Sequence, residues 1–148
     1  MNPQPVLSSE LRRLVETRLK DNLEGIQQTL SQVFKIQELG LEDLKETMAT
    51  LEESFNMLSQ KWSLQVLYML FLRKTAGFGE LKKTLGVNSR TLSNKLKSLS
   101  ENRFLERIVQ QGPPVRVRYS LTEKGNNTIL LALPFLYYAS GNFTSQKT

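Results

Sequence analysis

Residues 89–101 combine side chains that can hydrogen-bond to base edges with leucines that can hold a helix in place. The leucines recur at spacings of four and three residues, which predicts one buried side of a helix. They are Leu92, Leu96 and Leu99. The side away from the leucines carries the polar residues Arg90, Ser93, Asn94 and Lys97, and Ser89 at the start of the helix is a further candidate contact. We expect this polar side to face a ligand that offers many hydrogen-bonding groups.

These residue types fit the major groove of duplex DNA. Arg can bond two acceptors of guanine, Asn can pair with adenine through two hydrogen bonds, and Ser is short enough to approach base edges or phosphates. Arg90, Ser93 and Asn94 are therefore candidates for reading bases, and Lys97 is a candidate for holding a phosphate. Any helix surface carries such residues, so the interpretation depends on the elements around this helix.

The residues before this helix predict the first half of a helix-turn-helix. Residues 78–85 place apolar side chains at helical spacing, Gly86 permits a tight turn, and Asn88 can cap the next helix. Three lysines flank the motif and are expected to contact phosphates, which position a protein on DNA without reading sequence. They are Lys82, Lys83 and Lys95.

A two-stranded hairpin is predicted after the second helix. Residues 104–110 form the first strand, residues 111–114 form a turn rich in Gly and Pro, and the return strand alternates between apolar and polar residues. Arg116 and Arg118 fall on the polar, solvent side of the return strand. With Gln111 they form a wing that would grip a phosphate backbone or enter the minor groove. Ordinary solvated arginines on a strand are the plainer interpretation.

Two long helices are predicted in residues 1–58. Ser8 or Ser9 can cap the first helix, Gly40 can end it, and the second helix covers residues 41–58. Each helix has a narrow apolar seam at spacings of three and four residues, as in a coiled coil. The seams can pack on their own subunit or on a second subunit. We favour a second subunit, because a two-helix hairpin cannot close a core alone.

A last helix is expected after Thr122, which can cap it. Residues 126–139 are apolar around most of the helix circumference, so we expect them to fill the dimer interface beside the N-terminal helices. An aromatic-lined ligand pocket is the alternative. Residues 140–148 are expected to form a flexible tail. The residues expected at the dimer interface are Leu19, Leu23, Ile26, Leu30, Leu44, Met48, Leu51, Phe55, Phe135 and Tyr138.

Residues 61–72 are dense in apolar side chains and predict the scaffold helix of a winged-helix core. No Gly or Pro occurs between Leu41 and Ala76, so the preceding helix can run into the scaffold helix or break near Ser59. The predicted organisation is a dimerisation hairpin, a DNA-binding winged helix-turn-helix, a C-terminal interface helix and a tail. Their ranges are 1–58, 59–125, 126–139 and 140–148.

Charge is divided unevenly along the chain. Residues 1–58 hold six Lys or Arg against ten Asp or Glu, a net charge of −4, whereas residues 59–148 hold fourteen against four, a net charge of +10. The basic half is the half with the helix-turn-helix pattern, as binding to phosphates requires. A lysine-rich surface that only maintains solubility is the alternative.

Composition also excludes several kinds of site. The chain has no Cys and no His, which excludes disulfides, thiol redox sensing, and metal or catalytic sites built from these residues. No paired-carboxylate motif stands out, so we expect neither an enzyme nor a cofactor. The N-terminus lacks the pattern of a signal peptide, and the longest apolar stretch, residues 129–139, is about half the length that spans a bilayer. We expect a cytoplasmic, nucleoid-associated protein without membrane contact.

Several short motifs occur in a characteristic order. They are Lys61-Trp62, Phe78-x-Glu80-Leu81, Arg90-Thr91-Leu92-Ser93, Leu105-Glu106-Arg107, Pro113-Pro114, and Tyr119 to Gly125 with the sequence YSLTEKG. In these motifs the chain resembles the HxlR-type group of MarR-related winged-helix regulators. The resemblance implies a homodimeric, DNA-binding transcription factor that uses the helix beginning near Ser89 and the wing at Gln111 to Arg116.

The chain departs from that group in three features. A long acidic helical hairpin precedes Met57, in place of a short N-terminal element. The lack of Cys excludes the thiol-based sensing known among relatives. Arg118 stands where relatives often carry an acidic residue, and the wing is a residue longer.

The sequence thus predicts a mainly α fold with a small β-hairpin, formed by a winged helix-turn-helix core and an N-terminal two-helix dimerisation extension. The expected function is sequence-specific binding of double-stranded DNA by a homodimeric transcriptional regulator; the sequence does not support a particular small-molecule effector. Two alternatives remain: a winged-helix module for protein interactions, and a protein that coats DNA independently of its sequence.

Overall fold

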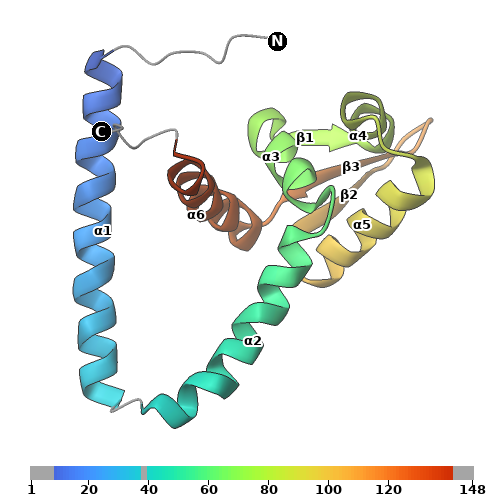
Figure 1. Cartoon of the computed structure of the whole chain (residues 1–148). Helices are drawn as coiled ribbons and strands as arrows, with labels where there is room; N and C mark the ends of the chain where they lie inside the picture. Colours follow the sequence, from blue (N-terminus) through green and yellow to red (C-terminus); the bar gives the residue numbers. More distant parts are fainter. Residues whose placement is uncertain (1–8, 38–39, 142–148) are drawn as a thin grey trace. The chain divides into compact units, whose positions relative to one another are not determined.

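The computed structural model describes residues 9–37 and 40–141, which form helices and one small sheet (Figure 1). In chain order the elements are α1 (Ser9–Gln37), α2 (Leu41–Ser59), α3 (Ser63–Arg73), β1 (Thr75–Gly77), α4 (Phe78–Leu85), α5 (Ser89–Glu101), β2 (Leu105–Gln110), β3 (Arg116–Leu121) and α6 (Glu123–Ala139). The mainly helical class with a winged helix-turn-helix is confirmed.

The chain divides into two compact units. One unit holds α1, the first part of α2 and the end of α6, and the other holds residues 49–133. Both α2 and α6 therefore cross from one unit to the other. The winged helix-turn-helix lies entirely within the second unit, so its geometry is described without reference to the first.

The two N-terminal helices form where their leucine seams predict them. α1 begins at Ser9 and α2 covers Leu41–Ser59, one residue beyond the predicted end. Ser8 lies outside the described residues, and so do residues 38–39 before Gly40. No residue of α2 is buried. Leu58, at the end of its apolar seam, packs half-buried against the core of the second unit, and the seam residues before it are exposed.

A sharp elbow separates α2 from α3. Trp62 adopts a left-handed conformation with φ of 77°, and α3 starts at the next residue. The buried Ser63 hydroxyl donates to the Met57 carbonyl at 3.2 Å, which ties the new helix to the end of the old one. The chain therefore breaks near Ser59, and the scaffold helix is two residues shorter at its start than predicted from Lys61.

The second unit has one apolar core to which each of its complete elements contributes. α3 supplies the most buried side chains, because apolar residues surround much of its circumference. The fully buried leucines of α4 and α5 face the same interior. The large residues with almost no exposure are Leu67, Leu70, Leu81, Leu92, Leu96, Leu99 and Ile129.

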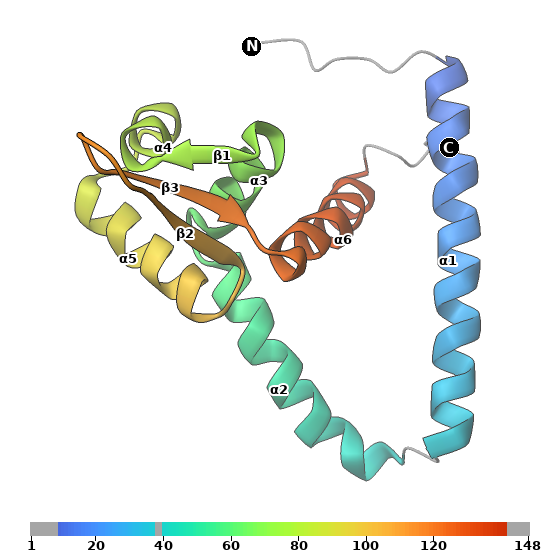
Figure 2. The ribbon, with the colours of Figure 1, turned by 180° about the vertical axis from the view of Figure 1, so that it is seen from behind.

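The sheet has three antiparallel strands in the order β1-β3-β2, and Figure 2 shows α5 running beside β2. The sequence predicted only the β2–β3 hairpin. β1 is three residues long, too short to show an alternating pattern, and it adds to β3 through the pair Ala76–Tyr119. Both hairpin strands start one residue later than predicted, at Leu105 and Arg116.

The last helix starts directly after Thr122, the residue predicted to cap it. The Gly125 amide donates to the Thr122 hydroxyl at 3.0 Å, and α6 runs from Glu123 to Ala139. The predicted boundary after Gly125 thus falls inside this helix. Of the predicted tail, residues 142–148 lie outside the described residues.

Candidate nucleic-acid interface

The recognition helix α5 presents one continuous polar face. Asn88 caps it, because its side-chain oxygen accepts the Thr91 amide at 2.8 Å. The three leucines are buried as predicted, which fixes the rotation of the helix about its axis. The polar residues Ser89, Arg90, Ser93, Asn94 and Lys97 are all exposed. The structure therefore brings the predicted reading residues together on the surface.

The turn before α5 holds the two helices of the motif at a fixed angle. Gly86 has φ of 68°, a left-handed conformation that costs most other residues about 1–2 kcal/mol, and its amide donates to the Lys82 carbonyl at 3.0 Å. Leu81 anchors α4 in the core. Lys82 and Lys83 occupy the exposed last turn of α4, next to this turn.

Lys95 differs from the other predicted phosphate contacts. Its ammonium group donates to the Gln60 side-chain oxygen at 2.6 Å, so it links the recognition helix to the elbow between α2 and α3. Its side chain is half-buried, whereas Lys82 and Lys83 are exposed. Gln60 is a partner that sequence reasoning missed, because 35 residues separate it from Lys95.

The wing projects two exposed polar side chains near its tip. Gln110 pairs with Arg116 in the β2–β3 ladder, and the turn between these strands begins at Gln111. Gly112 adopts φ of 139°, a conformation that residues with a side chain rarely reach, so glycine is needed for this turn. Gln111 and Arg116 are exposed, as a contact with a phosphate backbone requires.

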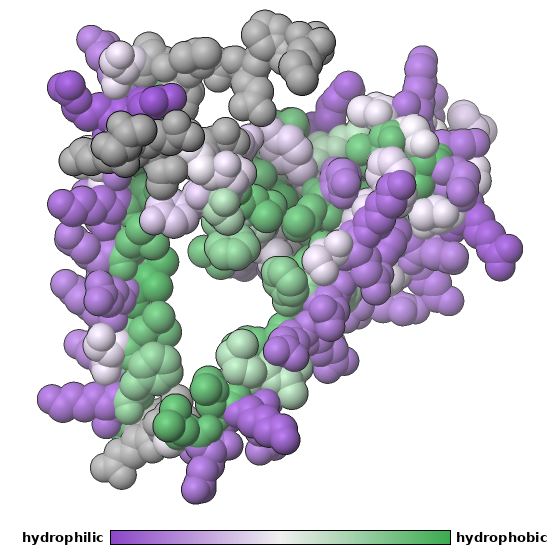
Figure 3. Space-filling view, viewed as in Figure 1, coloured by the Kyte–Doolittle hydropathy of each residue, from purple (hydrophilic) through white to green (hydrophobic). Residues whose placement is uncertain are grey.

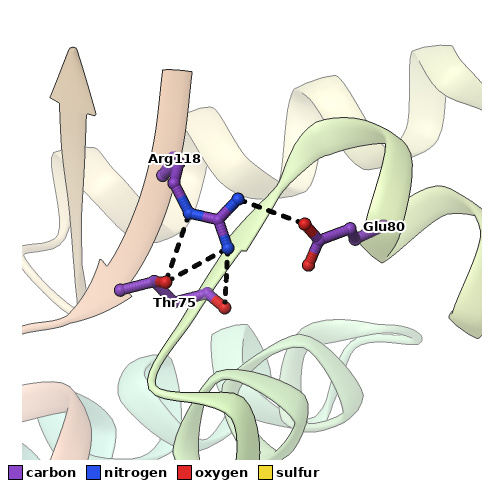
Figure 4. Close-up of polar contacts among 3 residues, drawn as sticks. All are labelled: Thr75, Glu80 and Arg118. Atoms are coloured by element: carbon purple, nitrogen blue, oxygen red, sulfur yellow. Dashed lines mark hydrogen bonds and ion pairs between the residues drawn. The ribbon is translucent and has the colours of Figure 1, made fainter. Parts of the chain in front are cut away.

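Arg118 is not the solvent-facing arginine that the alternation predicted. Its guanidinium donates to the Glu80 carboxylate at 3.1 Å and to the Thr75 hydroxyl and carbonyl at 3.1–3.3 Å (Figure 4). Only 28% of its side chain is exposed. The prediction that Arg118 faces solvent is wrong, because β1 lies beside β3 and brings Thr75 within reach of the guanidinium. No periodicity indicated either partner.

The predicted interface residues of the helices remain largely uncovered. Along α1, one side is hydrophobic and the opposite side is hydrophilic (Figure 3). The seam residues Leu23, Ile26 and Leu30 are each about half exposed, and Phe55 of α2 is 61% exposed. Leu19 is half-buried. Exposed residues of the same kind are Leu44, Met48, Leu51, Phe135 and Tyr138.

The described residues contain neither a metal-binding cluster nor a membrane span. In residues 9–37 and 40–141, no cluster of three acidic residues has the geometry to hold a metal ion. No helix in the described part of the chain is long and apolar enough to cross a membrane.

Comparison with known proteins decides the family. The family model described as HxlR-like helix-turn-helix matches residues 57–141, more than half of the chain. The chain belongs to the HxlR-like helix-turn-helix family. The match covers α3 to α6, whereas α1 and nearly all of α2 lie before it.

Relatives of known sequence support this family. YdzF of Bacillus subtilis, an uncharacterised HTH-type transcriptional regulator, is 31% identical over 80 residues, which are 53% of this chain and 73% of YdzF. The HTH-type transcriptional regulator YodB of the same organism is 33% identical over 76 residues, which are 51% of this chain and 67% of YodB. The predicted class, a DNA-binding helix-turn-helix transcriptional regulator of HxlR type, is confirmed.

Solved structures show the same fold. The crystal structure of diamide-treated YodB superimposes with a TM-score of 0.53 at 30% identity, over 63% of this chain and 90% of YodB. A regulator from Enterococcus faecalis V583 assigned to the MarR family gives a TM-score of 0.57 at 27% identity, over 65% of this chain and 86% of that protein. The predicted relation to MarR-type regulators is therefore confirmed as well.

Proposed function

We propose that this HxlR-like protein regulates transcription as a homodimer that binds a pseudo-palindromic duplex. The observation that carries the proposal is the exposed polar face of α5, held by a buried leucine seam and an Asn88 cap. A recognition helix of this kind lies in the major groove, and a twofold dimer places two such helices about one helical turn of DNA apart.

The contacts divide between reading and positioning. We assign Arg90, Ser93 and Asn94 to base edges, because their side chains offer the donors and acceptors that distinguish base pairs. Lys82, Lys83 and Lys97 are assigned to phosphates, and Gln111 and Arg116 to the backbone or minor groove beside the wing. Ser89 lies at the start of α5, where helix amides also favour a phosphate. Lys95 can contact a phosphate only by sharing its ammonium group with Gln60.

We propose that a second copy of the chain covers the apolar seams of α1 and α2. Seam residues from α1 and α2 are exposed at regular spacing, and isolated monomers rarely leave large apolar surfaces in water. In a twofold dimer the same surface of each copy forms both sides of the interface, so the apolar seam of one copy can pack on the apolar seam of the other. We assign the predicted interface residues of α6, Phe135 and Tyr138, to this dimer too.

The proposal includes no enzymatic reaction, cofactor or effector. It places the protein in the cytoplasm on the nucleoid, where the duplex is available. The shortage of acidic residues in the second half of the chain favours that partner, because four Glu oppose fourteen Lys or Arg in residues 59–148.

Selection of bound sites from a random duplex library tests the proposal. We expect the full chain to enrich an inverted repeat with half-site centres about 10 base pairs apart. Affinity for the selected site should then fall steeply between low and moderate salt. Salt-dependent binding without any enriched sequence would contradict specific regulation and indicate a DNA-coating protein. Absence of binding at low salt would indicate a protein-interaction module instead.

A further inference from the structure

We infer that Arg118 and Glu80 form a clamp that fixes the wing to the first helix of the helix-turn-helix, and that Arg118 positions the wing without contacting DNA. The inference rests on the proposed DNA binding and deepens it. It assigns to two residues a role in DNA affinity that neither the helix-turn-helix pattern nor the wing pattern indicates.

The contacts of the Arg118 guanidinium span three elements (Figure 4). One amino group donates to Glu80 in the first turn of α4, and the rest of the guanidinium donates to Thr75 at the start of β1. Arg118 itself belongs to β3, the central strand of the sheet. A single side chain thus joins the return strand of the wing to the first helix of the helix-turn-helix and to the short strand that precedes it.

The guanidinium lies next to the end of β1. Gly77 faces Arg118 across the β1–β3 ladder and immediately precedes α4. A β-carbon built at Gly77 would lie 3.9 Å from the nearest guanidinium nitrogen of Arg118, an ordinary van der Waals distance, so the guanidinium lies beside this part of β1.

The clamp connects two groups of proposed DNA contacts. Lys82 and Lys83 lie in the last turn of α4, and Arg116 lies two residues before Arg118 in β3. Without the clamp, the wing keeps its pairing in the sheet and the packing of α5 beside β2, but it loses the ion pair that ties it to α4. We infer that the clamp keeps the wing within reach of the DNA backbone while α5 lies in the major groove. The wing then loses less conformational entropy when the protein binds DNA.

Charge and hydrogen bonding argue against a direct phosphate contact. Arg has five N–H donors, and Arg118 makes four hydrogen bonds within the protein, which involve all three of its side-chain nitrogens. The positive charge is balanced by Glu80 at 3.1 Å, so the pair attracts a phosphate less than a free arginine does. Arg116, by contrast, is exposed.

The direction in which Glu80→Ala changes DNA affinity distinguishes a clamp from a phosphate contact. If Arg118 contacted a phosphate, Glu80→Ala would remove a nearby negative charge and tighten DNA binding. If the pair is a clamp, Glu80→Ala releases the wing and weakens binding of the selected duplex. A fall in the fraction of wings held in place to about one in five would weaken binding about fivefold. Glu106→Ala is the matched control, because it removes an exposed carboxylate from the adjacent strand β2 and should tighten binding slightly.

A double-mutant cycle adds a second readout. Arg118→Ala and Glu80→Ala should each weaken binding about fivefold, and the double variant should be no weaker than either single one. The double variant keeps the net charge of the wild type, so its slope of log affinity against log salt should be unchanged. A phosphate contact would instead lower that slope by about 0.9.

The exchanged pair, Glu80→Arg with Arg118→Glu, should recover part of the lost affinity, because it restores the ion pair between β3 and α4 but not the hydrogen bond to the Thr75 carbonyl. It also guards against a single variant that folds poorly. Melting temperatures of all variants should stay within a few degrees of the wild type, because both side chains are partly exposed. Tighter binding by Glu80→Ala, or a reduced salt slope of the double variant, would overturn the clamp. If the wild type binds no duplex, the proposed function fails instead.

Discussion

Side chains on α5 divide between packing and reading according to their angle about the helix axis. Leu92, Leu96 and Leu99 have at most 2% exposure and fill the core, so the residues a half-turn away point outward. Arg90 and Asn94 lie one turn apart on that outward side and are both exposed. Recognition of a DNA sequence depends on which of these side chains touch bases and which touch phosphates.

Arg90→Ala should change the sequence preference of the protein. A bidentate bond from arginine to guanine contributes about 1–3 kcal/mol of discrimination, and that preference should disappear at one position of each half-site. Repeating the site selection with the variant measures it, with Lys97→Ala as the matched control. Equal loss of affinity on every duplex would contradict base reading and make Arg90 a phosphate contact.

Arg116→Ala should weaken binding to all sequences alike. The side chain is exposed near the wing tip, where a phosphate contact releases counterions, so the slope of log affinity against log salt should fall by about 0.9. The control is Arg107→Ala, which removes the same charge from β2 opposite Tyr119. The prediction fails if both variants lower the slope equally.

Elements of the second unit are held together at a few close backbone contacts. The junction from α5 to β2 closes with the Phe104 amide donating to the Leu99 carbonyl at 2.9 Å, and Arg103 adopts a left-handed φ of 63°. The start of α6 then packs on the same junction, since the Thr122 amide donates to the Phe104 carbonyl at 3.1 Å. Packing at this point orients the recognition helix relative to the wing.

Gly125→Ala should destabilise the protein strongly. A β-carbon at this buried position would collide with the Phe104 backbone carbonyl, which cannot move without opening the α5–β2 junction. We expect a loss of about 1–3 kcal/mol in the free energy of unfolding. Denaturant unfolding followed by circular dichroism measures this loss.

Gly79→Ala provides the contrast within the same unit. Nothing lies within 4 Å of a β-carbon at this exposed position in α4, so the variant should gain about 0.4–1 kcal/mol through lower entropy of the unfolded chain. Similar losses at both positions would indicate that glycine is needed for a reason other than close packing.

Local patterns in the sequence predicted the helix-turn-helix to the residue, because leucine spacing, Gly86 and the Asn88 cap are all signals within a few residues. Contacts between distant residues could not be predicted in this way. Glu80 and Arg118 are 38 residues apart, and they meet where β1 pairs with β3 and leads into α4. The start of α3 was missed as well, because Trp62 adopts a left-handed conformation that its residue type does not indicate.

The family match and the helical extension cover different parts of the chain. The family match begins at residue 57, whereas the acidic helices with the exposed seams precede it. The family fold therefore accounts for α3 to α6, and the seams of α1 and α2 need their own explanation. Pairing of two copies through these seams would set the separation of the two recognition helices, and thus the spacing of half-sites.

Leu23→Asp with Ile26→Asp should convert the protein to a monomer. Both side chains lie in the exposed seam of α1, and an unpaired charge buried in an interface costs about 3–5 kcal/mol, which weakens self-association at least about a hundredfold. Sedimentation equilibrium measures the mass, and Gln28→Asp on the polar side of α1 is the control, which should stay dimeric. The monomer should still bind a single half-site weakly, because α5 and the wing lie in the other unit. A variant that remains dimeric would show that the seam of α1 packs within its own subunit.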